Sequence, residues 1–191
     1  MSITNKIKNS KNININFYNC KNCCRDEEEE FKRIEGFDNY LVSNFGNIKN
    51  NKTNRILKQS NHPKGYKLVD LSKNGNSKKF KVHRLVGISF LENPDNKPMI
   101  DHIDENKANN NVKNLRWATN RENEYNKGKR IDNKSGFKGV SFNKETKKYR
   151  ARININDKRK HLGYYETAEQ ASKVYEAKAK ELHGEFFYKN K

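Results

Sequence analysis

The chain has 191 residues, of which 32% are hydrophobic and 34% are charged, and its formal net charge is +18. So few apolar residues argue against one large continuous core and favour small modules. The positive charge requires an anionic partner, and nucleic acid is favoured over a membrane because the longest apolar run, LVGISFL at 85–91, is far too short to cross a bilayer.

Residues 1–29 are rich in Asn and Lys, end in an acidic run and show no hydrophobic period, so we predict a disordered tail. The N-terminus has no secretory signal, and we therefore expect an intracellular protein with reduced thiols. Three cysteines lie together in this tail, at Cys20, Cys23 and Cys24. Their spacing matches half of a zinc site, but no second half follows, so their role is left open.

Residues 30–80 are predicted to form short strands separated by turns, with a hairpin at Asn74-Gly75. The next segment, VHRLVGISF, has apolar residues at helical spacing, and Pro94 and Pro98 follow it. His83 near the start of this predicted helix has two interpretations, a histidine packed near a site or a contact with substrate phosphate. Arg84 beside it is a candidate phosphate contact.

Residues 99–119 read MIDHIDENKANNNVKNLRWAT and predict two short strands around a polar loop. Thr119 and Glu122 fit a capping box, so a helix should begin at Thr119 and carry Asn123 in its first turn. The chain contains 31 Asn, and the loop residues 109–111 are interpreted as turn residues.

The Asp-His pair in this stretch suits the hydrolysis of a phosphodiester bond. Neighbouring strand residues point to opposite sides, so Asp101 can bind a metal while His102 faces a water molecule. A histidine with a pKa of about 6.5 is mostly neutral in cells and can take the proton from that water. The carboxylate of Asp101 and the amide oxygen of Asn123 are hard ligands, which favours Mg²⁺, with Mn²⁺ as the alternative.

The stretch DHIDENKANNNVKNLRWATNRENEYN resembles the HNH homing endonucleases, whose metal finger is a strand, a loop, a strand and a helix. The resemblance implies that Asp101 and Asn123 bind a single divalent metal and that His102 is the general base. It implies that Asn114 ties the two strands together and orients the backbone of the histidine. The last ligand of the family is often His, so Asn123 represents the variant with Asn. The segment 30–80 resembles the module that precedes HNH in such nucleases, which implies a role in holding DNA.

A polar linker at 128–134 precedes three predicted strands and a helix that starts with a capping box at Thr167. Between Lys134 and Lys160 there are ten Lys or Arg and two acidic residues, so the sheet rather than the helix should face phosphate. A period of two places apolar residues on one face of the middle strand and potential readers of base edges on the other. The apolar set is Tyr149, Ala151, Ile153 and Ile155, and the polar set is Arg150, Arg152, Asn154 and Asn156.

Residues 135–187 resemble the Apetala-type (ethylene-response-factor) DNA-binding domain of plants, on the segments SGFKGVSF, YRARI and RKHLGYYETAEQASKVYEAKAKELHGEF. Such domains lay a three-stranded antiparallel sheet in the major groove. Ser141, Asn143, Asn154 and His161 depart from the residue types of the plant domains, so the plant target sequence is not transferred. The positions that match family contacts are Lys138, Ser141, Asn143, Arg152, Asn154, Arg159 and His161.

Together these features predict a modular α+β protein with a ββα-metal HNH finger and a three-stranded antiparallel sheet packed on one helix. The expected parts are the tail 1–29, the nuclease-associated segment 30–80, the nuclease 81–127, the linker 128–134 and the DNA-binding domain 135–191. The predicted function is a homing-type endonuclease that cuts double-stranded DNA as a monomer or weak dimer, in the host cytoplasm or nucleus if the source is viral. The alternatives are a DNA-binding regulator with an inactive finger and an RNA-binding or structural basic protein.

Overall fold

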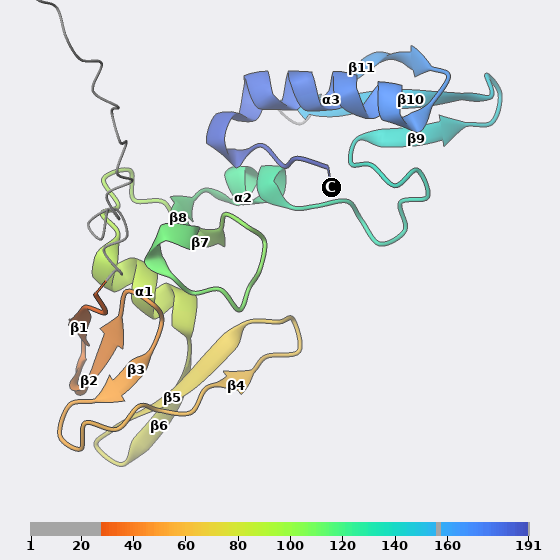
Figure 1. The fold of residues 1–191 in the computed structure, drawn as a ribbon. Coiled ribbons are helices and arrows are strands. Elements are labelled where there is room, and N and C mark those ends of the chain that lie inside the picture. Colours follow the sequence, from red (N-terminus) through yellow and green to blue (C-terminus); the bar gives the residue numbers. More distant parts are fainter. Residues whose placement is uncertain (1–27, 156–157, 191) are drawn as a thin grey trace, which may run out of the picture.

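A computed structural model describes residues 28–155 and 158–190 of the chain (Figure 1). The three cysteines and Asn156 lie outside these described residues. No helix in the part of the chain that the structure describes has the length and apolar run that a membrane span needs.

Two small antiparallel sheets form the N-terminal part. The hairpin between the strands at 67–73 and 76–81 turns at Asn74 and Gly75, as the sequence predicted. These two residues have φ of 52° and 78°. The first sheet has the order β1-β2-β3 and the second has the order β4-β5-β6. The strands are β1 (Phe31–Ile34), β2 (Phe37–Ser43), β3 (Ile48–Asn50), β4 (Ser60–Asn61), β5 (Lys67–Lys73) and β6 (Asn76–Lys81).

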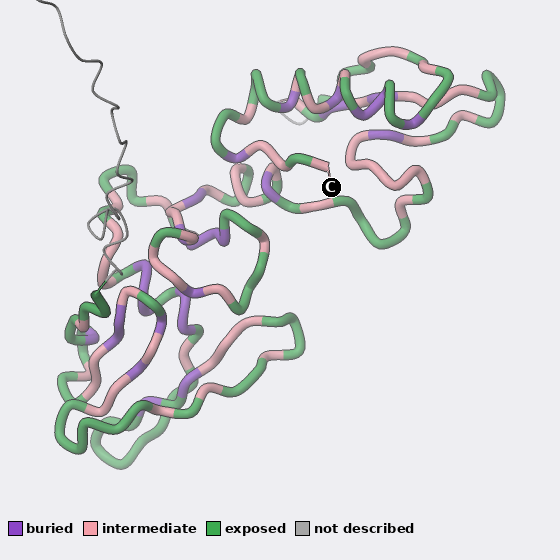
Figure 2. The backbone as a smooth tube through the Cα atoms, in the orientation of Figure 1, coloured by how far each residue is buried: buried purple, intermediate pink, exposed green. Residues whose placement is uncertain are grey.

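Helix α1 (Val82–Phe90) follows β6 directly and confirms the helix predicted from apolar spacing. Its buried face packs against both sheets and against the two strands that come next, so a single hydrophobic core crosses the expected boundary at residue 80 (Figure 2). The N-terminal segment and the nuclease segment are therefore one packed unit. The core consists of Ile34, Val42, Ile48, Val69, Leu71, Val82, Leu85, Val86, Ile100 and Leu115.

The two strands predicted around the Asn-rich loop are β7 (Met99–His102) and β8 (Leu115–Ala118). They pair antiparallel, with Asp101 opposite Arg116. Helix α2 (Asn120–Asn126) follows and has the predicted capping box, in which the Thr119 hydroxyl accepts from Glu122 N and the Glu122 carboxylate accepts from Thr119 N. Strand, loop, strand and helix thus come in the predicted order.

The C-terminal part confirms the predicted three-stranded antiparallel sheet covered by one helix, with the order β11-β10-β9. Ala151 and Ile153 face the helix and are buried, and on the helix Ala171, Tyr175 and Ala179 are buried against them. The elements are β9 (Val140–Asn143), β10 (Lys148–Ile155), β11 (Lys158–Tyr165), α3 (Ala168–His183) and a 3-10 turn at Gly184–Phe186.

Gly139, immediately before β9, is required by packing as well as by backbone geometry. Its φ is +76°, and a Cβ atom there would lie 2.1 Å from Cδ2 of the buried Tyr175 ring. Gly136 has a similar φ of +83°, but a Cβ atom there would meet nothing within 4 Å. Substitutions at these two glycines therefore separate the free-energy cost of a left-handed backbone from the free-energy cost of a steric clash.

We expect Gly139→Ala to lower the free energy of unfolding by about 1–3 kcal/mol more than Gly136→Ala, because only the first substitution overpacks the space around Tyr175. The cost at Gly136 should be about 1–2 kcal/mol, from the left-handed backbone alone. Urea unfolding followed by circular dichroism measures both values. Equal losses for the two variants would contradict the clash.

Candidate functional site

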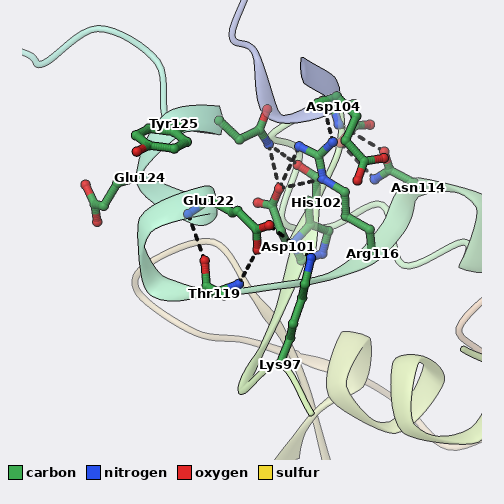
Figure 3. A network of polar contacts seen from close by, with 12 residues as sticks. Lys97, Asp101, His102, Asp104, Asn114, Arg116, Thr119, Glu122, Glu124 and Tyr125 are labelled. Atoms are coloured by element: carbon green, nitrogen blue, oxygen red, sulfur yellow. Dashed lines mark hydrogen bonds and ion pairs between the residues drawn. The ribbon is translucent and has the colours of Figure 1, made fainter. Parts of the chain in front are cut away.

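Asp101 on β7 is buried among hydrogen-bond donors, with 6% of its surface exposed. Its Oδ2 atom accepts from Nε and Nη2 of Arg116, at 3.1 and 3.0 Å, and from Nδ2 of Asn126 at 3.0 Å (Figure 3). Among the described residues, no donor hydrogen-bonds to its Oδ1 atom. The carboxylate is therefore oriented through one oxygen while the other remains available.

His102, the next residue, is also buried, and its Nε2 atom lies 3.2 Å from Oδ1 of Asn110. Because an amide oxygen can only accept, this contact assigns the proton to Nε2 and the lone pair to Nδ1. Burial lowers the pKa of His102, although the Asn110 contact and the nearby carboxylates of Asp101 and Asp104 act in the opposite direction. The ring is accordingly neutral near pH 7 and able to accept a proton.

His83 in the first turn of α1 packs beside His102, with the two ring centroids 4.8 Å apart. Burial, helped by the electrostatic interaction with the neighbouring His102 ring and by the charges of Lys81 and Arg84, lowers the pKa of His83 to about 3, so this ring is also neutral. Its Nδ1 atom is buried without a hydrogen-bond partner among the described residues. Packing near the site, one of the two interpretations of His83, fits this position. Arg84 is exposed on the same helix, and its contact with DNA stays a prediction.

Asn114 closes the loop between β7 and β8. Its Oδ1 atom accepts from the backbone N of Asp104 at 3.0 Å, and its Nδ2 atom donates to the Asp104 carboxylate and to the Asn109 carbonyl. Its own carbonyl accepts from the backbone N of Ile103 at 2.9 Å. These contacts suit the strand-tying role that the family resemblance implies for Asn114.

The N-terminal part also holds this loop. The backbone N of Val112 donates to the Asn44 carbonyl at 2.7 Å. Gly46 approaches Asn110 so closely that a Cβ atom on the glycine would lie 2.8 Å from the Asn110 Cβ. Asn110, predicted as a turn residue, is instead buried and contacts His102. Periodicity and motif spacing contained no signal for this contact, because its partner lies eight residues away across a loop.

Helix α2 carries two asparagines that bear on the site, Asn123 and Asn126. Asn123, the predicted ligand, is half-buried, and its side chain makes no hydrogen bond to a described residue. Asn126, one turn further on, is buried and donates to the Asp101 carboxylate and to the His102 carbonyl, the latter at 2.8 Å. Sequence reasoning missed Asn126, although its position three residues after Asn123 on the same helix was a usable signal.

The donor set fits a hard divalent cation. The described residues contain no group of three His, Cys, Asp or Glu side chains that could hold a metal ion. The oxygen atoms left without a described donor are instead one carboxylate oxygen of Asp101 and the amide oxygen of Asn123. Mg²⁺ typically takes one or two protein oxygens and completes its shell with water and phosphate oxygens. The chemical type of these two oxygens is therefore compatible with such an ion.

The C-terminal sheet gathers most of the remaining predicted residues on one face. Arg150, Arg152 and Asn154 alternate along β10 with the buried Ala151 and Ile153. Directly opposite residues on paired strands share a face. The cross-strand pairs are Arg150 with Ser141, Lys148 with Asn143, Arg152 with His161 and Asn154 with Arg159.

This polar face has a concentrated positive charge. Burial, and then the charges of Arg150 and Arg159, lower the pKa of Arg152. An open cleft of about 490 Å³ joins this face to the end of α2. The cations that line it are Lys127, Lys129, Arg130, Lys138, Arg152 and Arg159.

Lys138 does not lie on the polar face with the other predicted DNA contacts. Its Nζ atom donates to the carbonyls of Glu124, Tyr125 and Lys127, at the C-terminal end of α2. Burial lowers the pKa of Lys138 to about 8, with the carboxylates of Glu105 and Glu124 acting in the opposite direction. An ammonium group in this position caps the exposed carbonyls of a helix end, and the contact of Lys138 with DNA stays a prediction.

Comparison with known proteins identifies the first two segments. A family model described as NUMOD4 motif matches residues 29–72, and one described as HNH endonuclease matches residues 80–125. Uncharacterized HNH endonuclease L245 of Acanthamoeba polyphaga mimivirus is 42% identical over 90 residues, which are 47% of this chain and 27% of that protein. Protein 3.8 of Escherichia phage T7 is 36% identical over 87 residues, which are 46% of this chain and 71% of that protein.

DNA endonuclease I-HmuI of Bacillus phage SP01 is 42% identical over 103 residues, 52% of this chain and 59% of that protein. Its solved structure, described as DNA binding and cleavage by the HNH homing endonuclease I-HmuI, matches with a TM-score of 0.48 and covers 51% of this chain and 56% of that one. The chain thus spans less than two thirds of the mimivirus and SP01 relatives. The Apetala-type resemblance lies outside both family matches and stays a prediction. The finger around Asp101 therefore lies in a segment that belongs to the HNH endonuclease family and that follows a NUMOD4 motif.

Proposed function

We propose that this chain is a homing-type endonuclease that hydrolyses phosphodiester bonds of double-stranded DNA with a single divalent metal ion, Mg²⁺ or Mn²⁺. One observation carries the proposal. A buried carboxylate with one oxygen left available and a neutral buried imidazole are neighbours on β7, inside the segment that matches HNH endonucleases.

Each residue of the finger then has a separate role. Asp101 and Asn123 would hold the ion, which when bound supplies positive charge to the departing oxygen. His102 takes the proton of the attacking water at Nδ1, while Asn110 accepts from the Nε2 proton and keeps the ring oriented. Asn114 holds the loop in place and thereby sets the separation of the two strands.

The polar face of the C-terminal sheet would bind the duplex, as the Apetala-type resemblance implies. Arginine and asparagine side chains on alternate positions can reach base edges in the major groove, and the surrounding lysines can contact phosphate. The cleft at the end of α2 would continue this basic path toward the finger. Arg84 on α1 is a further candidate for phosphate contact. The residues proposed for this face are Ser141, Asn143, Arg150, Arg152, Asn154, Arg159 and His161.

We expect the unaltered protein to nick duplex DNA in Mg²⁺ and His102→Ala to slow nicking by about 10²–10⁴-fold, because the variant lacks the proton acceptor. Mapping of nicks in a mixed duplex library measures the activity. His62→Ala is the control, since His62 lies in a turn of the N-terminal part and should leave the rate unchanged. DNA retention without nicking by the unaltered protein would support the alternative, a regulator with an inactive finger.

Asn123→Ala tests the second ligand with little risk to the fold, because no described residue hydrogen-bonds to that side chain. We expect this variant to require a higher Mg²⁺ concentration for half-maximal nicking while its melting temperature stays unchanged. Asn123→His, which restores the residue frequent in the family, should recover nicking. Wild-type metal dependence in Asn123→Ala would remove Asn123 from the ligand set.

Arg152→Ala should weaken duplex binding and reduce the slope of log K against log salt concentration by about 0.9 if the side chain neutralises one phosphate. Fluorescence anisotropy over a salt series measures the slope. Lys173→Ala removes an exposed cation from α3 instead and should leave the slope unchanged. The opposite ranking of the two variants would place DNA on the helix.

A further inference from the structure

Arg116 on β8 lies between the finger and the C-terminal part. One edge of its guanidinium donates to the Asp101 carboxylate, as Figure 3 shows. Its Nη1 atom donates to the backbone carbonyl of Glu185 at 2.5 Å, and its Cζ atom lies 3.8 Å from the centroid of the Phe186 ring. A single side chain thus contacts both the proposed metal ligand and the segment after α3.

Phe186 serves this contact rather than the core of its own part. It is 5% exposed, but neither hydrophobic cluster of the C-terminal sheet and helix includes it, whereas its neighbour Phe187 packs against one of them. The Nζ atom of Lys97, which precedes β7, also lies 5.4 Å from the Phe186 ring centroid. The ring is therefore buried against cations of the nuclease segment.

Two other contacts keep this segment beside the finger. The rings of Tyr125 on α2 and His183 on α3 stack with centroids 3.7 Å apart and an interplanar angle of 4°. Lys138, just before β9, caps the end of α2. The position of the 3-10 turn at Gly184–Phe186 relative to Arg116 is consequently set from both sides of the interface.

The contacts of Arg116 restrict the orientation of the Asp101 carboxylate. A planar guanidinium that is held at one edge by a carboxylate, at another by a carbonyl and on its face by a ring cannot rotate. It therefore fixes the plane of the Asp101 carboxylate and the direction of the oxygen that remains available. Without the ring and the carbonyl, the same ion pair could persist in several orientations.

We propose that Arg116 and Phe186 are positioning residues through which the C-terminal part orients the Asp101 carboxylate for metal binding and cleavage. This inference rests on the proposed function, because it takes Asp101 to be a metal ligand. Partners of metal ligands commonly change metal affinity by about 10–100-fold when they are removed. Cleavage by the finger would then depend on the docked C-terminal part even where DNA binding is saturated.

The experiment compares Phe186→Leu, Arg116→Lys and the double variant in the full chain. Mn²⁺ binding without DNA is measured by the electron paramagnetic resonance signal of the free ion, and single-turnover nicking is measured at saturating DNA. We expect Phe186→Leu to weaken Mn²⁺ binding by about tenfold and to slow nicking by a similar factor, with DNA affinity unchanged within about twofold. The double variant should lose no more than Arg116→Lys alone, because Phe186 acts through Arg116.

Leu182→Ala is the matched control, since Leu182 is a large apolar residue near the end of α3 that is 38% exposed. It should leave Mn²⁺ binding unchanged. Phe186→Met fills the same space and replaces the Leu variant if that protein melts below the assay temperature. Normal Mn²⁺ binding and nicking in the folded Phe186 variant, or a loss confined to DNA affinity, would overturn the inference while the proposed function stands. Failure of the unaltered protein to bind Mn²⁺ or to nick DNA would overturn the proposed function itself.

Discussion

The ion pair between Asp101 and Arg116 is the interaction on which the site depends, because helix α2 contacts Asp101 and the segment after α3 contacts Arg116. The side chains are 7% and 11% exposed, so the pair is shielded from solvent. Removal of one partner from such a pair typically costs about 3–5 kcal/mol, since the other charge is left buried. The carboxylate that we propose as metal ligand is therefore oriented by the protein itself.

The finger is too small to supply this shielding alone. Its fully buried contribution to the shared core is Ile100 and Leu115, one residue from each strand. Helix α1 packs against these two strands and joins them to the N-terminal sheets, and Asn44 and Gly46 contact the loop that holds His102. The C-terminal segment contacts Arg116 from the other side. A finger of this size generally needs a metal or neighbouring modules to order it, and here both neighbours contribute.

The basic surface that we propose for DNA binding and the buried site that we propose for cleavage lie in different parts of the molecule. One concentration of positive charge is on the sheet β9–β11 and in the cleft beside it, where guanidinium groups lie close enough to affect one another. The finger instead keeps two buried histidines neutral. A neutral imidazole can accept a proton, whereas a protonated one cannot. Burial therefore keeps the histidines of the finger in the form that catalysis requires, while the basic sheet would bring the finger to DNA.

Local signals in the sequence were enough to predict the secondary structure around the site. The capping boxes at Thr119 and Thr167, the Asn74-Gly75 turn and the alternation along residues 149–155 depend on neighbours a few positions away, and all four occur as predicted. The Asp-His pair likewise needed only adjacency on a strand. Which asparagine contacts Asp101, which one contacts His102 and where Lys138 points depended on packing between segments distant in sequence. In a chain with 31 Asn, composition could not distinguish Asn126 from Asn123. Only the burial of one amide against the carboxylate, imposed by the tertiary fold, made that distinction.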